Sequence, residues 1–230
     1  MSSAVGHEDT VLPYLRERLN QGLRQIAYFV VPSAAAFAAL GHVIASALYQ
    51  TGQFSPDDAR YVWGILAGSA IGLLASTLGR LYASTYYALR DTRTPLRYAL
   101  VRVGLTIGLG YLFALHLPAL LNIAPRWGAA GLSASAGIAG WVEFVLLRSR
   151  LNARLGSSGI PPGFLARLWL AAGLAAAAGW GIHLALPTAN PVVHAVLVLG
   201  GYGLVYFMVT YALRIPQAAA VAGRFARRGR

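Results

Sequence analysis

The sequence predicts an all-α polytopic membrane protein with about six transmembrane helices. Of the 230 residues, 57% are hydrophobic and only 11% are charged, and the apolar residues gather in long runs between short polar segments. A soluble domain of this length is rarely so apolar. Each run is long enough to cross a bilayer of about 30 Å at a helical rise of about 1.5 Å per residue.

The charge pattern and the absence of cysteine exclude several classes of function. A net charge of +12 would suggest nucleic acid in a soluble protein, but here the arginines lie between apolar runs and at the C-terminal end. Membrane orientation explains that placement, so no nucleic-acid partner is expected. Cysteine is absent, which excludes disulfides, thiol catalysis and cysteine-ligated metal. No nucleotide loop, metal cluster or nucleophile–base set is visible, so we expect no enzyme activity, cofactor or metal.

The chain divides into five predicted segments. They are a disordered start with an amphipathic cytoplasmic helix (1–25), a four-helix part (26–155), a flexible link (156–163), a final transmembrane pair (164–213) and a basic cytoplasmic tail (214–230). Disorder is expected for residues 1–10, and leucines spaced by three and four indicate the amphipathic helix. The start of the chain is polar, so no cleavable signal peptide is expected.

The apolar runs and their flanks predict the topology. The expected spans are 26–48, 62–89, 98–117, 128–147, 164–186 and 192–213. Pro32 is predicted to kink the first span or lie near its start. Gly104 and Gly108 indicate a close helix-packing surface on the third. Arginines flank the N-terminal side of spans one, three and five and the C-terminal side of the others, so both termini are predicted to be cytoplasmic.

Ionisable groups inside spans are candidates for function because they are costly in lipid. Arg80 lies deep in the second span, and Ser76, Ser84 and Tyr87 fall near it at helical spacings. We expect this polar stripe to face a cavity and to bind substrate; the alternative is an arginine that reaches the interface along its own stem.

A second pair of charges lies in the next two spans. Arg102 and Glu143 sit at similar depth on adjacent antiparallel helices, so a salt bridge is predicted. The pair is either structural or involved in proton or ion coupling. The histidines near the outer ends of spans lack ligand spacing and receive no role. These are His42, His116, His183 and His194.

The loop between the second and third spans carries the most specific motif. Its residues are Asp91, Thr92, Arg93, Thr94 and Pro95. Asp91 and Thr92 are expected to end the second span. Thr94 is expected to cap the third span, with Pro95 as its first helical residue.

The string from Tyr86 to Pro95 resembles the corresponding cytoplasmic loop of the lipid II flippases, the MurJ/MviN family of the multidrug/oligosaccharidyl-lipid/polysaccharide exporter superfamily. Similar features are the Gly52-x-Phe54-Ser55-x-x-Asp58 loop and the Gly128-Ala-Ala-Gly131-Leu132 start of the fourth span. The resemblance covers about Leu12 to Gly156, and the last two spans fit the family's final helix pair. Arg80 matches a basic position of the family, whereas Glu143 stands where a neutral polar residue is more common.

The resemblance implies the C-terminal part of a flippase that moves lipid-linked peptidoglycan precursor across the bacterial plasma (inner) membrane by alternating access. Expected partners are lipid II, bilayer lipids, cell-wall synthesis proteins and, if the chain is a fragment, the missing first lobe. Two other hypotheses remain open at this point: a polysaccharide or drug exporter of the same superfamily, and a non-transporting membrane scaffold.

Overall fold

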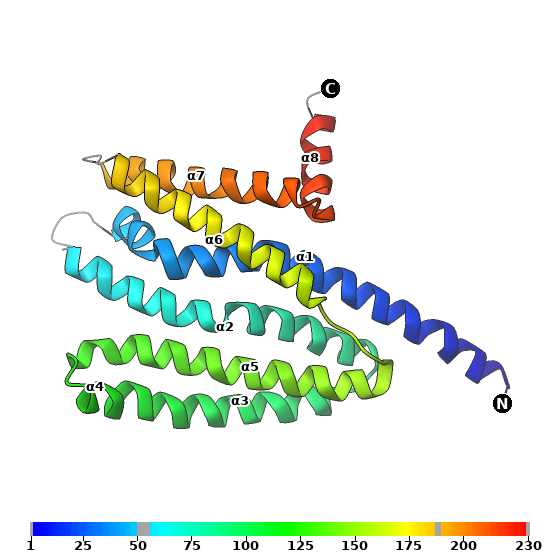
Figure 1. The fold of residues 1–230 in the computed structure, drawn as a ribbon. Coiled ribbons are helices and arrows are strands. Elements are labelled where there is room, and N and C mark those ends of the chain that lie inside the picture. The colour runs from blue at the N-terminus through cyan, green and yellow to red at the C-terminus, as the bar shows by residue number, and fades with distance from the viewer. Residues whose placement is uncertain (1, 50–55, 187–189, 229–230) are drawn as a thin grey trace.

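The computed structural model describes residues 2–49, 56–186 and 190–228, and these residues are helical apart from short connections (Figure 1). The long helices are α1 (Ser2–Tyr49), α2 (Pro56–Ala88), α3 (Arg93–Tyr111), α5 (Gly128–Leu155), α6 (Pro162–Ala185) and α7 (Pro191–Ala212). The shorter elements are a π-helical turn (Leu112–His116), α4 (Leu117–Leu120), a 3₁₀ turn (Pro125–Trp127) and α8 (Pro216–Arg228).

Six helical segments of the described chain are long and apolar enough to cross a membrane, which confirms the predicted number of spans. Their bounds are 13–49, 57–88, 93–120, 125–155, 162–185 and 191–212. The helices pack in the order α3, α5, α2 and α1, with the α6–α7 pair against the other side of α1 (Figure 1). Helix α3 contacts mainly α5, so most of its surface is exposed.

Helix α1 remains continuous through Pro32, and α7 compensates for the missing hydrogen bond. Proline has no N–H, so the carbonyl of Tyr28, four residues earlier, loses its usual donor. The Tyr206 hydroxyl donates to this carbonyl at 2.7 Å, and Tyr202 donates to the Pro32 carbonyl at 2.7 Å. The Tyr28 ring is buried, and its hydroxyl lies 3.4 Å from that of Thr210. Hydrogen bonds with Tyr202, Tyr206 and Thr210 of α7 therefore hold α1 at its proline turn.

Glycine contacts set the spacing between α2 and α5. Gly72 and Gly137 lie backbone to backbone, and a side chain on either would collide with the other helix. Such contacts are common where helices pack in lipid without a hydrophobic driving force. The packing surface predicted on the third span is not found among the described residues: no atom of another described helix lies within 4 Å of where a side chain would begin at Gly104 or Gly108.

The end of the third span contains an irregular turn with a clear cause. Pro118 removes the N–H that would bond the carbonyl of Ala114, and α3 widens here into the π-helical turn. Gly128 and Gly131, at the start of α5, lie directly against backbone carbonyls of this turn. Side chains at these two positions would clash, which explains why small residues open α5.

The link between α5 and α6 is held by hydrogen bonds to three helices, whereas the sequence predicts a flexible link. The Ser158 N–H donates to Asn152 Oδ1 at 2.9 Å, and its hydroxyl lies 3.3 Å from that of Tyr82. The Gly159 N–H donates to Asn20 Oδ1 at 2.9 Å. These side chains satisfy backbone groups near the ends of the helices, so they fix the position of the link.

The two ends of the chain differ from the prediction. Helix α1 begins at Ser2, where disorder is expected for residues 1–10, because extending an existing helix costs far less than nucleating one. The expected basic tail forms helix α8. Gly52, Phe54 and Ser55 of the outer-loop pattern lie outside the described residues.

Candidate functional site

The predicted polar stripe lies on a face of α2 that the neighbouring helices leave largely open. Arg80, Ser84 and Tyr87 are exposed, and Ser76 is partly buried. Arg80 precedes the end of α2 at Ala88 by eight residues, which places it about 12 Å into the span by helical rise. The four residues therefore lie along one face of α2, with Tyr87 at its end and Ser76 furthest inside the span.

The hydrogen bonds of the stripe leave the guanidinium of Arg80 available. The Ser76 hydroxyl donates to the Leu73 carbonyl at 3.2 Å, and the Ser84 hydroxyl donates to the Leu81 carbonyl at 2.8 Å. Within residues 2–49, 56–186 and 190–228, Arg80 makes no hydrogen bond or ion pair. A guanidinium carries five N–H donors in a planar fork that suits phosphate and carboxylate groups.

The structure brings Arg102 of α3 and Glu143 of α5 together. Arg102 Nη1 lies 3.0 Å from Glu143 Oε2, and the exposed side-chain fractions are 38% and 15%. The carboxylate is thus the more shielded partner. The pair joins α3 to the rest of the bundle near the arginine-rich end, the end formed by the α2–α3 loop, the α5–α6 link and the end of α7. It lies on α3 and α5, whereas the polar stripe lies on α2.

Asp91 organises the loop between α2 and α3. The Thr94 N–H donates to Asp91 Oδ1 at 3.0 Å, and the Thr94 hydroxyl donates to Oδ2 at 2.8 Å. The prediction that Thr94 caps α3 is therefore wrong: α3 begins at Arg93, and the Asp91 carboxylate accepts the bonds. These bonds, first the backbone N–H, then the hydroxyl and Arg154, lower the pKa of Asp91 from 3.8 to about 2.

The turn before Asp91 explains its position. Arg90 has a left-handed backbone with φ 57°. The Asp91 N–H donates to the Tyr86 carbonyl at 3.0 Å, and the Arg90 N–H donates to the Tyr87 carbonyl at 3.0 Å. This pair of bonds is the Schellman pattern that ends helices, usually with glycine at the left-handed position. The backbone of α2 thus directs the carboxylate towards the start of α3.

Arg154 lies in the last turn of α5, and the sequence pattern did not single it out. Its Nη1 lies 2.8 Å from Asp91 Oδ2, and its guanidinium lies 5.8 Å from the centre of the Tyr86 ring. The buried Tyr86 hydroxyl donates to the Leu147 carbonyl at 3.1 Å. Arg154 therefore ties the end of α5 to the α2–α3 loop. In the sequence, only its position among the arginines that end the fourth span indicated that Arg154 lies near this loop.

Three histidines without a predicted role meet at the opposite end of the bundle. His183 Nδ1 of α6 lies 2.7 Å from His194 Nε2 of α7, and the His42 ring of α1 lies 4.9 Å from that of His183. His194 Nδ1 lies 3.1 Å from the Leu186 carbonyl, which can only accept. His194 Nε2 is then the acceptor in neutral histidine, and His183 donates to it. The three histidines join α1, α6 and α7.

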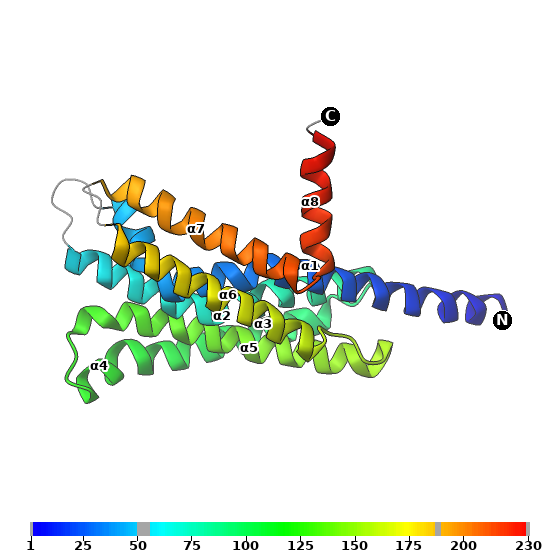
Figure 2. The ribbon, with the colours of Figure 1, turned by 45° about the horizontal axis from the view of Figure 1, so that its top comes forward.

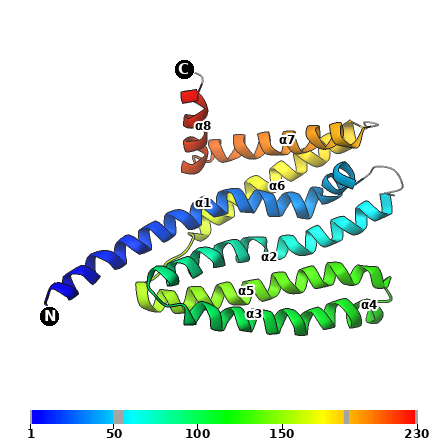
Figure 3. The ribbon, with the colours of Figure 1, turned by 180° about the vertical axis from the view of Figure 1, so that it is seen from behind.

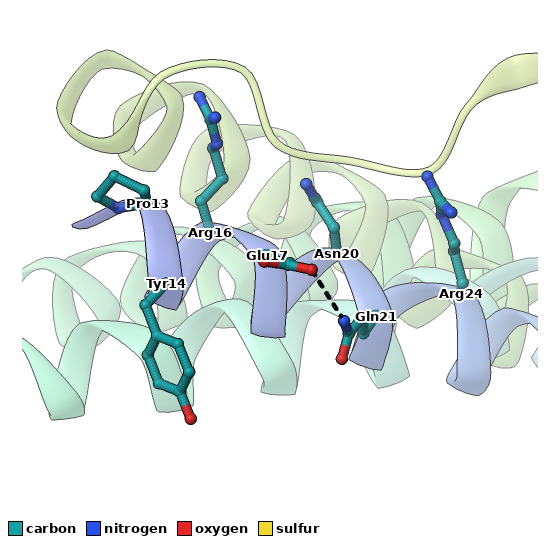
Figure 4. Close-up of a pocket in the computed structure, with 7 residues that line it drawn as sticks. All are labelled: Pro13, Tyr14, Arg16, Glu17, Asn20, Gln21 and Arg24. Carbon is teal, nitrogen blue, oxygen red and sulfur yellow. Dashed lines mark hydrogen bonds between the residues drawn. The ribbon is translucent and has the colours of Figure 1, made fainter. Parts of the chain in front are cut away.

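A hollow of about 600 Å³ lies along α1 at the arginine-rich end (Figure 4). Figure 4 shows Arg16, Asn20 and Arg24 directed to one side of α1, towards the link between α5 and α6. Glu17 accepts a hydrogen bond from Gln21 Nε2 at 3.3 Å. In the part of the chain that the structure describes, no group of three or more histidine or acidic side chains, the three histidines of α1, α6 and α7 included, is arranged to hold a metal ion.

Known proteins resemble this chain over most of its length. The model of the family described as lipid II flippase MurJ matches residues 1–213. A probable lipid II flippase MurJ of Rhizobium meliloti is 29% identical over 206 residues, which cover 84% of this chain and 36% of the relative. The lipid II flippase MurJ of Burkholderia cenocepacia is 29% identical over 136 residues, 59% of this chain and 24% of the relative.

A solved structure has the same fold. It is titled lipid II flippase MurJ, inward closed conformation, and superposes with a TM-score of 0.70 at 21% sequence identity, covering 86% of this chain and 39% of the solved one. The chain thus spans 36% and 39% of the lengths of the Rhizobium relative and the solved structure. With the family model matched over residues 1–213, the chain belongs to the MurJ family of lipid II flippases.

Proposed function

We propose that this chain forms the C-terminal part of a flippase that moves lipid-linked peptidoglycan precursor across the bacterial inner membrane by alternating access. Membership of the MurJ family supports the substrate class. The observation that carries the proposal is the open polar stripe on α2, with Arg80 unpaired among the described residues and about 12 Å inside the span.

The stripe suits a surface that faces a cavity between two lobes. An exposed arginine at this depth is costly against lipid, whereas a water-filled cavity solvates it. Ser76, Ser84 and Tyr87 extend the polar surface along the same helix face. We propose that the part of a full-length family member that this chain does not cover faces this side of α2, and that the lipid II headgroup enters between the two.

Arg80 is proposed to bind the pyrophosphate of the headgroup. Its fork pairs with phosphate oxygens and stays charged at any physiological pH. In a water-poor cavity, such a contact contributes about 1.5–3 kcal/mol, the range for hydrogen bonds to charged groups. An arginine in the stripe also argues against a drug exporter that selects cations.

The test uses a full-length protein in which the first lobe is restored from a MurJ relative. Export of lipid-linked precursor is compared among wild type, Arg80→Lys and Arg80→Ala at matched membrane abundance. Arg80→Ala is expected to lower export about tenfold or more, the equivalent of about 1.5 kcal/mol. Arg80→Lys keeps the charge but loses the fork, so its effect is expected to be milder.

Arg60→Ala is the matched control. Arg60 lies near the other end of α2 and forms an exposed pair with Asp57 at 3.2 Å, a contact that contributes little. Its export is expected to equal that of wild type. Full export by Arg80→Ala would falsify the assigned role of Arg80, and loss of export in Arg60→Ala would show that the assay reports general damage to α2.

A further inference from the structure

Helix α8 leaves the bundle at the arginine-rich end. Figures 1, 2 and 3 all show it turning away from α7 and projecting outward, roughly at right angles to the long helices. The turn is fixed by Arg214, with φ 52°, and by the Ile215 N–H, which donates to the Thr210 carbonyl at 3.1 Å. Ile215 and Ala218 are buried. Because α7 has the length and composition of a span, α8 lies along the membrane surface.

The sequence of α8 is typical of a helix at a membrane interface. Arginines occur at positions 224, 227 and 228, and small or apolar residues occupy most of the rest. Short helices that combine an apolar face with arginine bind anionic lipid surfaces. This places a basic helix next to the point where α1 crosses the end of α7.

A groove of about 420 Å³ lies between α1 and the start of α8. Both helices contribute polar and apolar residues to its lining: Gln21, Arg24, Gln25 and Phe29 come from α1, and Pro216, Gln217, Ala220 and Val221 from α8. Among the described side chains, no carboxylate lines it. Gln217 Oε1 is buried and has no hydrogen-bond partner among the described residues. The groove therefore combines an unpaired positive charge with apolar lining residues.

The cationic and apolar groups that α1 contributes to the groove lie at different depths in the membrane. Arg24 precedes Phe29 by five residues on α1, so Phe29 lies about 7.5 Å deeper by helical rise. Phe29 is 54% exposed, an open apolar surface below a cationic one. A phospholipid has the same order, with a phosphate at the surface and an acyl chain beneath it. A soluble phosphate would leave the apolar lining residues uncovered.

We propose that the groove between α1 and α8 binds an anionic phospholipid. Its phosphate pairs with the Arg24 guanidinium, its polar headgroup contacts the glutamines, and one acyl chain lies on Phe29 and Val221. The bound lipid belongs to the surrounding bilayer and holds α8 against α1. This site is separate from the stripe on α2, so it stands whether or not the chain moves lipid II.

The experiment measures lipids that stay bound to the purified full chain in native mass spectrometry. The protein is equilibrated with equal amounts of phosphatidylglycerol and phosphatidylcholine, without lipid II. Wild type is expected to retain phosphatidylglycerol preferentially. Arg24→Gln is expected to reduce that preference about fivefold, the effect of about 1 kcal/mol for one arginine near an anionic membrane surface. Ala220→Trp fills the groove and is expected to reduce retention of both lipids.

Arg18→Gln is the matched control. Arg18 is an exposed arginine of α1 that does not line the groove, and its Nη1 donates a hydrogen bond to the Tyr14 hydroxyl at 3.2 Å. Its lipid preference is expected to equal that of wild type. Equal retention of the two lipids by wild type, or equal effects of Arg24→Gln and Arg18→Gln, would overturn the proposal. So would displacement of the bound lipid by millimolar glycerol phosphate, which would assign a soluble ligand instead.

Discussion

Asp91 is a single residue whose charge holds the turn between α2 and α3. Its carboxylate accepts two bonds from Thr94 and pairs with Arg154, and these contacts lower its pKa from 3.8 to about 2. A carboxyl whose folded pKa is lowered stabilises the fold above its ordinary pKa. That contribution is lost as pH falls through the folded pKa.

The thermal midpoint of the purified chain is therefore expected to fall between about pH 4 and pH 2, and Asp91→Asn is expected to reduce this fall. The measurement is thermal unfolding in detergent across that range. Asp57→Asn is the control, since Asp57 forms only an exposed pair with Arg60. If both variants keep the full pH dependence of wild type, Asp91 is not its source.

The Arg102–Glu143 pair makes a second prediction for single residues. Arg102→Leu alone leaves the shielded Glu143 carboxylate without its partner. It is expected to destabilise the chain by about 2 kcal/mol, less than loss of a fully buried pair because Arg102 is partly exposed. Arg102→Leu with Glu143→Leu is expected to cost less than the sum of the two single changes. Additive losses in the unfolding free energies would show that the two charges do not interact.

Between elements, the contact of α1 with α7 depends on hydroxyls that replace a missing backbone hydrogen bond. Tyr206→Phe removes the donor to the Tyr28 carbonyl and keeps the ring. We expect a loss of about 1–3 kcal/mol, the penalty for an unsatisfied buried acceptor. Tyr211→Phe, at an exposed position of the same helix, is expected to change stability little. Equal stability of the two variants in detergent unfolding would show that the Tyr206–Tyr28 hydrogen bond does not stabilise the contact of α1 with α7.

The contact of α2 with α5 can be tested with two glycine variants, Gly72→Ala at the contact and Gly104→Ala as the control. Gly72→Ala places a methyl group against the backbone of Gly137 and is expected to destabilise the chain by about 1–3 kcal/mol. Gly104→Ala meets open space and is expected to be neutral or slightly stabilising, since alanine favours helix. Unfolding midpoints compare the two. A loss in Gly104→Ala as large as in Gly72→Ala would indicate a partner on α3.

For the whole molecule, the positive-inside rule predicts that the arginine-rich end faces the cytoplasm. The chain has no cysteine, so single cysteines report the side of the membrane without interference. A membrane-impermeant maleimide is expected to label Ala124→Cys in spheroplasts and Thr92→Cys only after lysis; both positions are exposed. Labelling of Thr92→Cys in spheroplasts would reverse the orientation.

The large-scale architecture could be predicted because it depends on local properties of the sequence. Apolar runs of sufficient length located the six spans. The Arg102–Glu143 contact was predicted because the two residues lie at similar depth on neighbouring spans. The family resemblance rested on short strings such as Tyr86 to Pro95.

The remaining contacts join residues that are distant in sequence, and no single-chain pattern specifies them. The hydrogen bond between Tyr206 and Tyr28 connects residues 178 positions apart, and that between Gly159 and Asn20 connects residues 139 apart. One signal was present but unused: Tyr202, Tyr206 and Thr210 recur every four residues in an otherwise apolar span. The histidines of α1, α6 and α7 offered no comparable spacing.

The proline turn of α1 has a consequence for the order in which the protein is made. Tyr28 is synthesised 178 residues before Tyr206. At about 5–20 residues per second, this separation lasts roughly 10–35 s. During that interval α1 is in the bilayer with a carbonyl for which α7 has not yet provided the donor. The first span therefore reaches its final hydrogen bonding only when the sixth arrives, and a ribosome stalled between them leaves α1 incomplete.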